Sequence, residues 1–155
     1  YTLSLHDALP ICNKSGHELL LEVILPADNP DHKPAYYYEI MRHFYRLGIK
    51  PDWWKLPPLP LESWQAVGQL IEQQDPHCRG ILLLGLDAPE ETLKAGFAAA
   101  AQAPWVKGFA VGRTIFAQPS RQWLLGELDD RSLIHQVKSN YLRLINYWRE
   151  ARPAQ

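Results

Sequence analysis

Four short apolar runs alternate with longer segments of helical periodicity, and this alternation limits the possible folds more than any other feature of the 155-residue sequence. The first run is nearly unbroken, which is typical of a strand buried on both faces of a parallel sheet. We expect strands over Glu18–Leu25, Ile49–Leu56, Gly80–Leu86 and Val106–Val111. The sequence therefore predicts an α/β fold made of four successive parallel βα units.

Helix signals occupy the segments between these runs. We expect helices over Ala35–Leu47, Leu61–Gln74, Ala88–Gln102 and Asp129–Glu150. Gly48 would end the first of these helices, and the capping-box spacing of Asp87 and Glu90 predicts that Asp87 caps the third. Before the last helix, we expect a loop through Pro119 and a short helical turn over Arg121–Gly126. This order of elements fits either half of an eight-stranded (β/α)8 barrel or a small open parallel sheet.

Charge and cysteine usage exclude several classes of partner. Acidic and basic residues are interspersed and the formal net charge is −1, so no long-range field would gather nucleic acid or anionic lipid. The apolar runs fall far short of the roughly 20 residues that cross a bilayer. Cys12 and Cys78 have no CxxC partner, which predicts neither a disulfide framework nor a zinc module. We therefore expect a cytoplasmic protein that holds no metal and binds neither nucleic acid nor membranes.

The first eleven residues are predicted to lie outside the fold. Residues 1–11, YTLSLHDALPI, carry no clear period and resemble the translated sequencing adapter that contaminates some assembled metagenomic reading frames. We predict a non-native leader that packs poorly, with the native chain beginning near Cys12. The alternative is a poorly ordered native helix. Residues 12–150 would then form the predicted domain, and residues 151–155 a frayed tail.

Two charged residues stand inside apolar strands, where an unpaired ion is unfavourable. Glu22 lies near the carboxyl end of the first predicted strand, on the same face as Ile24. From spacing alone, a catalytic carboxylate and a salt-bridged structural one are equally supported. Lys55 closes the second strand after Trp53 and Trp54, whose rings would desolvate its amine, lower its pKa and make it nucleophilic. The alternative is a strand-end lysine that extends into solvent.

Glycine and arginine follow the fourth predicted strand. Gly112 lets backbone N–H groups approach an anion closely, and Arg113 offers a charged fork for phosphate oxygens. Eight-stranded barrels often bind phosphate after their last strands, so a barrel would favour this role. Gly85, at the end of the third strand, is a further candidate for the same phosphate. The alternatives are a surface arginine after a glycine turn and, at Gly85, a tight strand-to-helix turn.

Taken together, these residues resemble a known family. The resemblance is carried by GHELLLE at 16–22, GIKPDWWK at 48–55 and the stretch 108–116, which ends in VGRTIF. These segments are similar to class I aldolases of the TIM-barrel superfamily, specifically to the aldolase-like domain found C-terminal to 5-dehydro-2-deoxygluconokinase in bacterial inositol catabolism. The resemblance runs from residue 16 to residue 150 and implies the C-terminal half of a (β/α)8 TIM barrel.

The resemblance also implies roles for individual residues. In that superfamily the Schiff-base lysine lies on the sixth strand, an acid/base glutamate on the fifth, and a phosphate site at the seventh and eighth. Lys55 would thus form the imine, Glu22 would be the acid/base carboxylate, and Gly112 and Arg113, with Gly85, would bind phosphate. No cofactor is implied, because the imine serves as electron sink. The implied reaction splits 2-deoxy-5-keto-gluconate 6-phosphate into dihydroxyacetone phosphate and malonate semialdehyde.

Parts of the implied protein lie outside this sequence. The first four barrel strands and the kinase domain are missing, so we expect the parent protein to be the enzyme. We expect this chain alone to be an inactive fragment with open strand edges that favour self-association. The alternatives are a non-catalytic sugar-phosphate-binding or regulatory domain of the kinase fusion and a purely structural repeat unit. Asp52 receives no role, and His17 and His43 are expected at the surface.

Overall fold

The structure is a computed structural model that describes residues 5–25, 33–85 and 88–152. Its strands are β1 (Leu20–Glu22), β2 (Trp53–Leu56), β3 (Gly80–Leu84) and β4 (Val106–Ala110). Its helices are α1 (Leu5–Ser15), α2 (Ala35–Arg46), α3 (Leu61–Gln74), α4 (Glu90–Ala100), α5 (Arg113–Leu124) and α6 (Asp130–Ala151). The alternation of strands and helices confirms the predicted α/β class.

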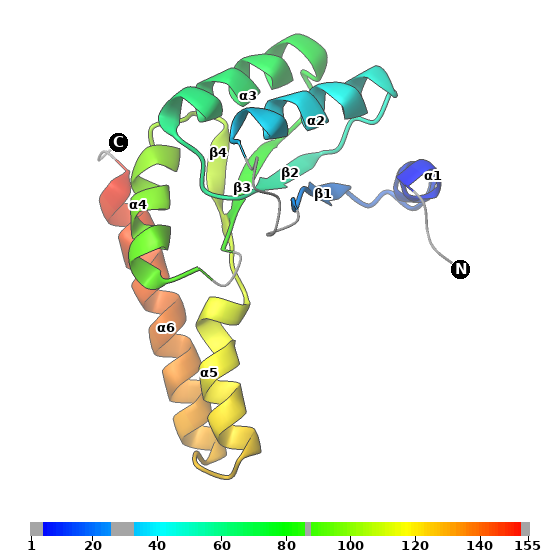
Figure 1. The fold of residues 1–155 in the computed structure, drawn as a ribbon. Coiled ribbons are helices and arrows are strands. Elements are labelled where there is room, and N and C mark those ends of the chain that lie inside the picture. The colour runs from blue at the N-terminus through cyan, green and yellow to red at the C-terminus, as the bar shows by residue number, and fades with distance from the viewer. Residues whose placement is uncertain (1–4, 26–32, 86–87, 153–155) are drawn as a thin grey trace.

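All four strands lie in one parallel sheet with the order β1-β2-β3-β4 (Figure 1). The order follows the chain without reversal, so right-handed crossovers place the connecting helices on a single face. Helices α2, α3 and α4 accordingly cover one side of the sheet in Figure 1. The prediction of adjacent parallel strands is confirmed, and the arrangement is consistent with half of a barrel.

The strands are shorter than the apolar runs predicted. The first covers three residues rather than Glu18–Leu25, and the second begins at Trp53 rather than at Ile49. The Ile49 N–H donates to the Phe44 carbonyl at the end of α2, so it is not available for pairing in the sheet. Pro51 follows and has no N–H to donate to a neighbouring strand. The apolar runs of the sequence therefore extend beyond the residues that pair in the sheet.

The segment after β4 corrects the sequence prediction. The expected loop through Pro119 and short turn over Arg121–Gly126 are replaced by the continuous helix α5, which contains Pro119. Proline lacks the N–H that would bond to the carbonyl four residues earlier, here that of Ile115. The Asn140 side chain on α6 donates to that carbonyl instead, at 2.8 Å. The partner helix therefore satisfies the group that the proline leaves unpaired.

The core lies between the sheet and the helices. Trp54 on β2 is fully buried and donates its indole N–H to the Tyr45 hydroxyl on α2 at 2.8 Å. At the other edge, Trp148 of α6 packs edge-on against Phe97 of α4 and Phe109 of β4. These aromatic contacts attach the first and last helices of the layer to the sheet.

Several predictions concern the ends of elements. Helix α3 has the predicted bounds, and Gly48 follows α2 with φ +74° as expected of a helix stop. Asp87, the predicted cap, lies outside the described residues, and α4 begins after Pro89. Helix α6 ends at Ala151, within the predicted tail, whose residues 153–155 are likewise outside the described ranges.

Helix α1 stands apart from the sheet in Figure 1, and the assignment of residues 1–11 as a non-native leader stays a prediction. Within the described parts of the chain, no helix is long and apolar enough to cross a membrane.

Candidate functional site

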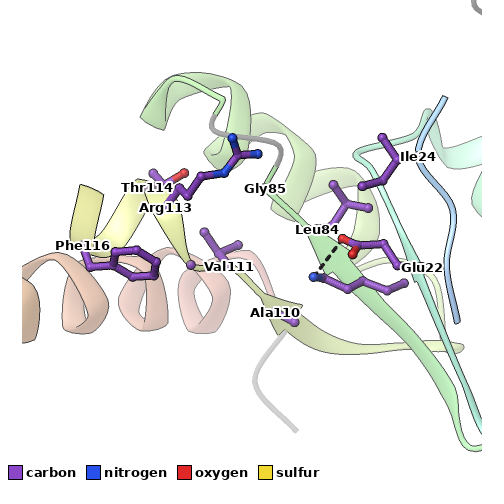
Figure 2. A pocket seen from close by; sticks show the side chains of 11 residues that line it. Glu22, Ile24, Leu84, Gly85, Ala110, Val111, Arg113, Thr114 and Phe116 are labelled. Atoms are coloured by element: carbon purple, nitrogen blue, oxygen red, sulfur yellow. Dashed lines mark ion pairs between the residues drawn. The ribbon is translucent and has the colours of Figure 1, made fainter. Parts of the chain in front are cut away.

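A pocket lies at the carboxyl ends of the strands. Carboxyl ends of parallel strands are where ligands bind in most α/β folds, because loops and helix N-termini converge there. The pocket has a volume of about 290 Å³ and takes residues from all four strand ends (Figure 2). Its lining comprises Glu22, Ile24, Lys55, Leu84, Gly85, Ala110, Val111, Gly112, Arg113, Thr114 and Phe116. The structure thus brings together all five residues predicted for the site, although they span much of the sequence.

Glu22 and Lys55 form an ion pair on the open face of the sheet. They are register partners on β1 and β2, and the Lys55 Nζ lies 2.9 Å from the Glu22 Oε1. Leu21 and Val23, on either side of Glu22, are buried. Alternation along the strand therefore points Glu22 away from the helices. The two side chains are 37% and 21% exposed respectively, so each charge is partly hydrated as well as paired.

The surroundings of the Lys55 amine differ from the sequence prediction. Trp54 was expected to desolvate it, but its ring lies on the opposite face, packed against Phe44 and Tyr45. The Trp53 indole N–H is engaged by the Glu18 carboxylate at 2.6 Å. Neighbouring residues on one strand point to opposite faces, so Trp54 points away from the Lys55 amine. The group that lies against the amine is the Glu22 carboxylate.

The first turn of α5 forms the other side of the pocket. Gly112 is the N-cap residue, and its carbonyl accepts hydrogen bonds from the N–H groups of Ile115 and Phe116. As a glycine, Gly112 has no side chain with which to cap this end of the helix. Among the described residues, the N–H groups of Arg113 and Thr114 find no backbone acceptor. Such N–H groups, together with the helix dipole, attract anions, and the Arg113 guanidinium adds a full positive charge.

Figure 2 shows the two charged regions on opposite sides of the pocket, with Arg113 and Thr114 on one side and the Glu22 ion pair on the other. Apolar side chains lie between them, including Leu84 and Val111. The pocket therefore presents an anion-attracting side and a separate amine–carboxylate pair to a small molecule.

Gly85 has a packing reason to be glycine. A Cβ built at this position would lie 2.9 Å from the Val111 Cγ1, closer than side-chain carbons normally approach. Glycine therefore lets the end of β3 approach the loop after β4. This supports the interpretation of Gly85 as a close-packed turn, while its predicted phosphate contact stays a prediction.

Some residues that line the pocket were not predicted from the sequence. Ile24 was noted only as sharing a face with Glu22, and Thr114 and Phe116 were not assigned to the site although they directly follow the Gly-Arg pair. Both residues lie in the first turn of α5, which begins at Arg113. They were not predicted because a loop through Pro119 was expected in place of this helix.

The residues left without a role lie elsewhere. The Asp52 Oδ2 accepts the Leu19 N–H at 2.8 Å, which fixes the start of β1 at the end of the sheet opposite the pocket. The His17 Nδ1 and the Ser15 hydroxyl are hydrogen-bonded in an exposed position, and His43 is exposed on α2. Both histidines are thus at the surface, as predicted. In the described ranges, no three His, Cys, Asp or Glu side chains are grouped as a metal site would require.

Sequence comparison adds family membership to this geometry. None of the curated proteins matches the chain. Residues 3–152 match the sequence model of a family described as "Uncharacterized protein conserved in bacteria (DUF2090)". This match includes every strand and every residue that lines the pocket. The protein therefore belongs to the DUF2090 family.

Proposed function

We propose that the chain is the C-terminal half of a (β/α)8 barrel and carries the Schiff-base site of a class I aldolase acting on a phosphorylated keto-sugar acid. The observation that carries the proposal is the Glu22–Lys55 pair, with amine and carboxylate 2.9 Å apart at neighbouring strand ends. The same pocket contains Arg113 and the start of α5. An amine, a proton-transfer group and an anion site are the three parts that this chemistry requires.

The topology supports the barrel. Strands that follow chain order with helices on one face are the repeating unit of (β/α)8 barrels, whereas doubly wound sheets reverse their strand order. Helix α5 is an additional helix between β4 and α6, and barrels often bind phosphate at such a helix. Strands β1 and β4 are the sheet edges, where the strands of the other half-barrel would pair.

The ion pair suits the first step of the proposed reaction. Transfer of a proton from the Lys55 ammonium to the Glu22 carboxylate produces a neutral amine, which attacks the substrate ketone to form a carbinolamine. Glu22, now protonated, donates its proton to the departing hydroxyl, and water leaves as the imine forms. Because the Nζ and the carboxylate oxygen are already within hydrogen-bond distance, this transfer needs no rearrangement of the strands.

The same carboxylate can serve carbon–carbon bond cleavage. Glu22 removes the proton from the hydroxyl group β to the imine carbon, and a carbonyl forms there as the adjacent carbon–carbon bond breaks. The electron pair of that bond moves to the protonated imine and yields an enamine on Lys55. Protonation of the enamine and hydrolysis of the resulting imine release the second product and regenerate the amine.

Arg113 and the N–H groups at the start of α5 would hold the substrate phosphate and thereby position the ketone against Lys55. The substrate 2-deoxy-5-keto-gluconate 6-phosphate, and its products dihydroxyacetone phosphate and malonate semialdehyde, are proposed from the family resemblance. The geometry of the pocket supports a small phosphorylated ketone as the broader class.

One observation favours a second candidate function. A partly exposed ion pair between neighbouring strands can also be purely structural, and Arg113 would then bind a sugar phosphate without imine chemistry. In this second candidate function, the chain is a non-catalytic or regulatory domain of a kinase fusion. Chemical trapping separates the two candidates, because only an imine is reduced to a stable covalent adduct.

The test is borohydride trapping with the keto-sugar phosphate in an intact barrel that includes this chain. We expect a reduced adduct on Lys55, located by peptide mass spectrometry. Lys55→Arg should abolish the adduct, because a guanidinium keeps the charge but does not form the imine. Lys50→Arg is the matched control and should leave the adduct in place, because Lys50 is an exposed residue before β2 and does not line the pocket. An adduct at another lysine, or none in the soluble barrel, would favour the binding domain.

A further inference from the structure

The hairpin of residues 113–142, made of α5 and the first half of α6, projects from the fold. It extends away from the sheet in Figure 1, and no other described helix or strand lies alongside its tip in this view. Helix α5 has 12 residues and is therefore about 18 Å long, which sets the length of the projection. Side chains that point outward from this hairpin are accessible to another molecule.

Large apolar side chains are exposed on the hairpin. Most of those exposed in the described residues belong to it, including Trp123, Leu124, Leu125, Ile134, Tyr141 and Leu142. Leu124 and Ile134 are 76% and 66% exposed. Isolated apolar residues are common on protein surfaces, whereas a group of them on one element indicates an interaction surface.

An apolar groove runs along the same hairpin and has a volume of about 510 Å³. Ile115 of α5 and Leu133, Ile134 and Val137 of α6 form apolar walls, and Lys138 is the charged residue of the lining. The groove and the pocket at the strand ends share no residue. A groove of this composition fits an apolar side chain that has an acidic neighbour.

Helix α6 itself carries such a combination. Asp130, Ile134 and Lys138 are exposed and four residues apart, so they lie on one face of the helix with Ile134 midway between the two charges. Lys138 takes part in none of the ion pairs between described residues. Asp130 accepts the Trp123 indole N–H at 2.7 Å but is likewise in none of those ion pairs. The stripe is therefore complementary in charge to a reversed copy of itself.

We propose that the hairpin is a dimerisation surface and that its partner is a second copy of this chain, related by a two-fold axis beside Ile134. When α6 crosses its counterpart in antiparallel direction at this residue, Asp130 of each copy lies opposite Lys138 of the other. A two-fold interface forms both contacts together. Ile134 of each copy enters the apolar groove of the other and is removed from water.

Charge also selects the direction of the crossing. In a parallel crossing at Ile134, Asp130 would face its own counterpart and so would Lys138, and like charges placed opposite each other disfavour association. The antiparallel crossing pairs opposite charges at both positions. The proposal does not depend on the aldolase activity, because the groove lies outside the pocket that contains Lys55.

The first experiment measures the oligomeric state of the purified chain by sedimentation velocity. We expect the wild type to be a dimer. Ile134→Glu places carboxylates at the centre of the interface and should give a monomer, with circular dichroism as the check that the variant is folded. Leu47→Glu is the matched control and should leave the dimer in place, because Leu47 is an exposed leucine at the end of α2, outside the hairpin.

Charge reversal identifies the partner as a second copy. Asp130→Lys and Lys138→Glu each place like charges opposite each other at both contacts, so each variant alone should dimerise about tenfold more weakly than the wild type. A mixed dimer of the two variants has opposite charges at both contacts. An equimolar mixture should therefore recover the wild-type dissociation constant, and this comparison does not require the Ile134→Glu variant to fold.

A wild-type dimer that is lost in Ile134→Glu and recovered on mixing the two charge-reversal variants supports the proposal. A monomeric wild type would overturn it and assign the groove to a different protein partner. Association that neither Ile134→Glu nor the charge reversals weaken, such as contact through the open edges of the sheet, would also overturn it. A mixture that stays as dissociated as its components would refute the antiparallel crossing. Borohydride trapping at Lys55 tests the proposed function separately.

Discussion

Gly96 on α4 and Gly68 on α3 allow a direct test of how tightly the helices pack. Both positions would gain about 1 kcal/mol of helix stability from Gly→Ala. A Cβ at Gly96 would lie 2.8 Å from the Cβ and 3.0 Å from the Cγ of Pro58, whereas carbon atoms in favourable contact are about 3.5–4.0 Å apart. At Gly68 the close atom is the Cδ1 of the Trp105 ring, also at 2.8 Å.

The two neighbours differ in their freedom to move. The Pro58 ring is closed onto its own backbone nitrogen and cannot rotate away, and Pro58 lies between the buried residues Pro57 and Leu59. Relief of the contact would require this loop to shift, and overpacking of this kind costs about 1–3 kcal/mol. After the helix gain, we expect Gly96→Ala to destabilise the protein by about 1 kcal/mol.

Gly68→Ala is the matched control, because the Trp105 ring is a partly buried side chain, so relief of the contact moves this ring and its hydrogen bond to Glu72 rather than the backbone. The free energy of unfolding of Gly68→Ala should stay near the wild-type value, because the gain in helix stability offsets the cost of moving the indole ring. Urea unfolding followed by circular dichroism gives both values, compared at a common m-value. If Gly96→Ala proves as stable as Gly68→Ala, the packing argument at the loop after β2 is refuted.

Three further predictions concern buried and capping groups. Asp129→Ala should lower the melting temperature at neutral pH, because hydrogen bonds from the Ser132 side chain and from the Ser132 backbone N–H at the start of α6 hold the pKa of the Asp129 carboxyl below its usual 3.8. This stabilisation is complete above pH 3.8 and is lost as the pH falls through the native pKa, so mutant and wild type should converge in acid. Tyr45→Phe should cost about 1–3 kcal/mol in urea unfolding, because the buried Trp54 indole N–H would lose its acceptor, and an unchanged midpoint would contradict this. Burial raises the pKa of the Cys78 thiol to about 11, so at pH 8 a thiol reagent should label the half-buried Cys12 well before Cys78, and equal rates in the native protein would argue against the buried position.

The order of elements and the membership of the pocket could be predicted from the sequence. Parallel strands end on one side of a sheet, so the residues at the ends of successive apolar runs had to meet, and Glu22, Lys55, Gly85 and Arg113 do so. Helix α3 also has its predicted bounds, because the prolines before it prevent earlier pairing and its pattern is uninterrupted. Whether four more strands close the sheet into a barrel stays a prediction.

Contacts between distant segments decided the features that could not be predicted from the sequence. Local propensity indicated a loop at Pro119, but the Asn140 side chain, 25 residues from Ile115, satisfies the carbonyl that the proline leaves unpaired, and the helix continues. The aromatic residues before Lys55 suggested a desolvated amine, but strand alternation turned Trp54 to the helix side and sheet register set Glu22 beside Lys55. A sequence carries propensity and periodicity, whereas a hydrogen-bond partner or a counter-ion from another element exists only once the chain has folded.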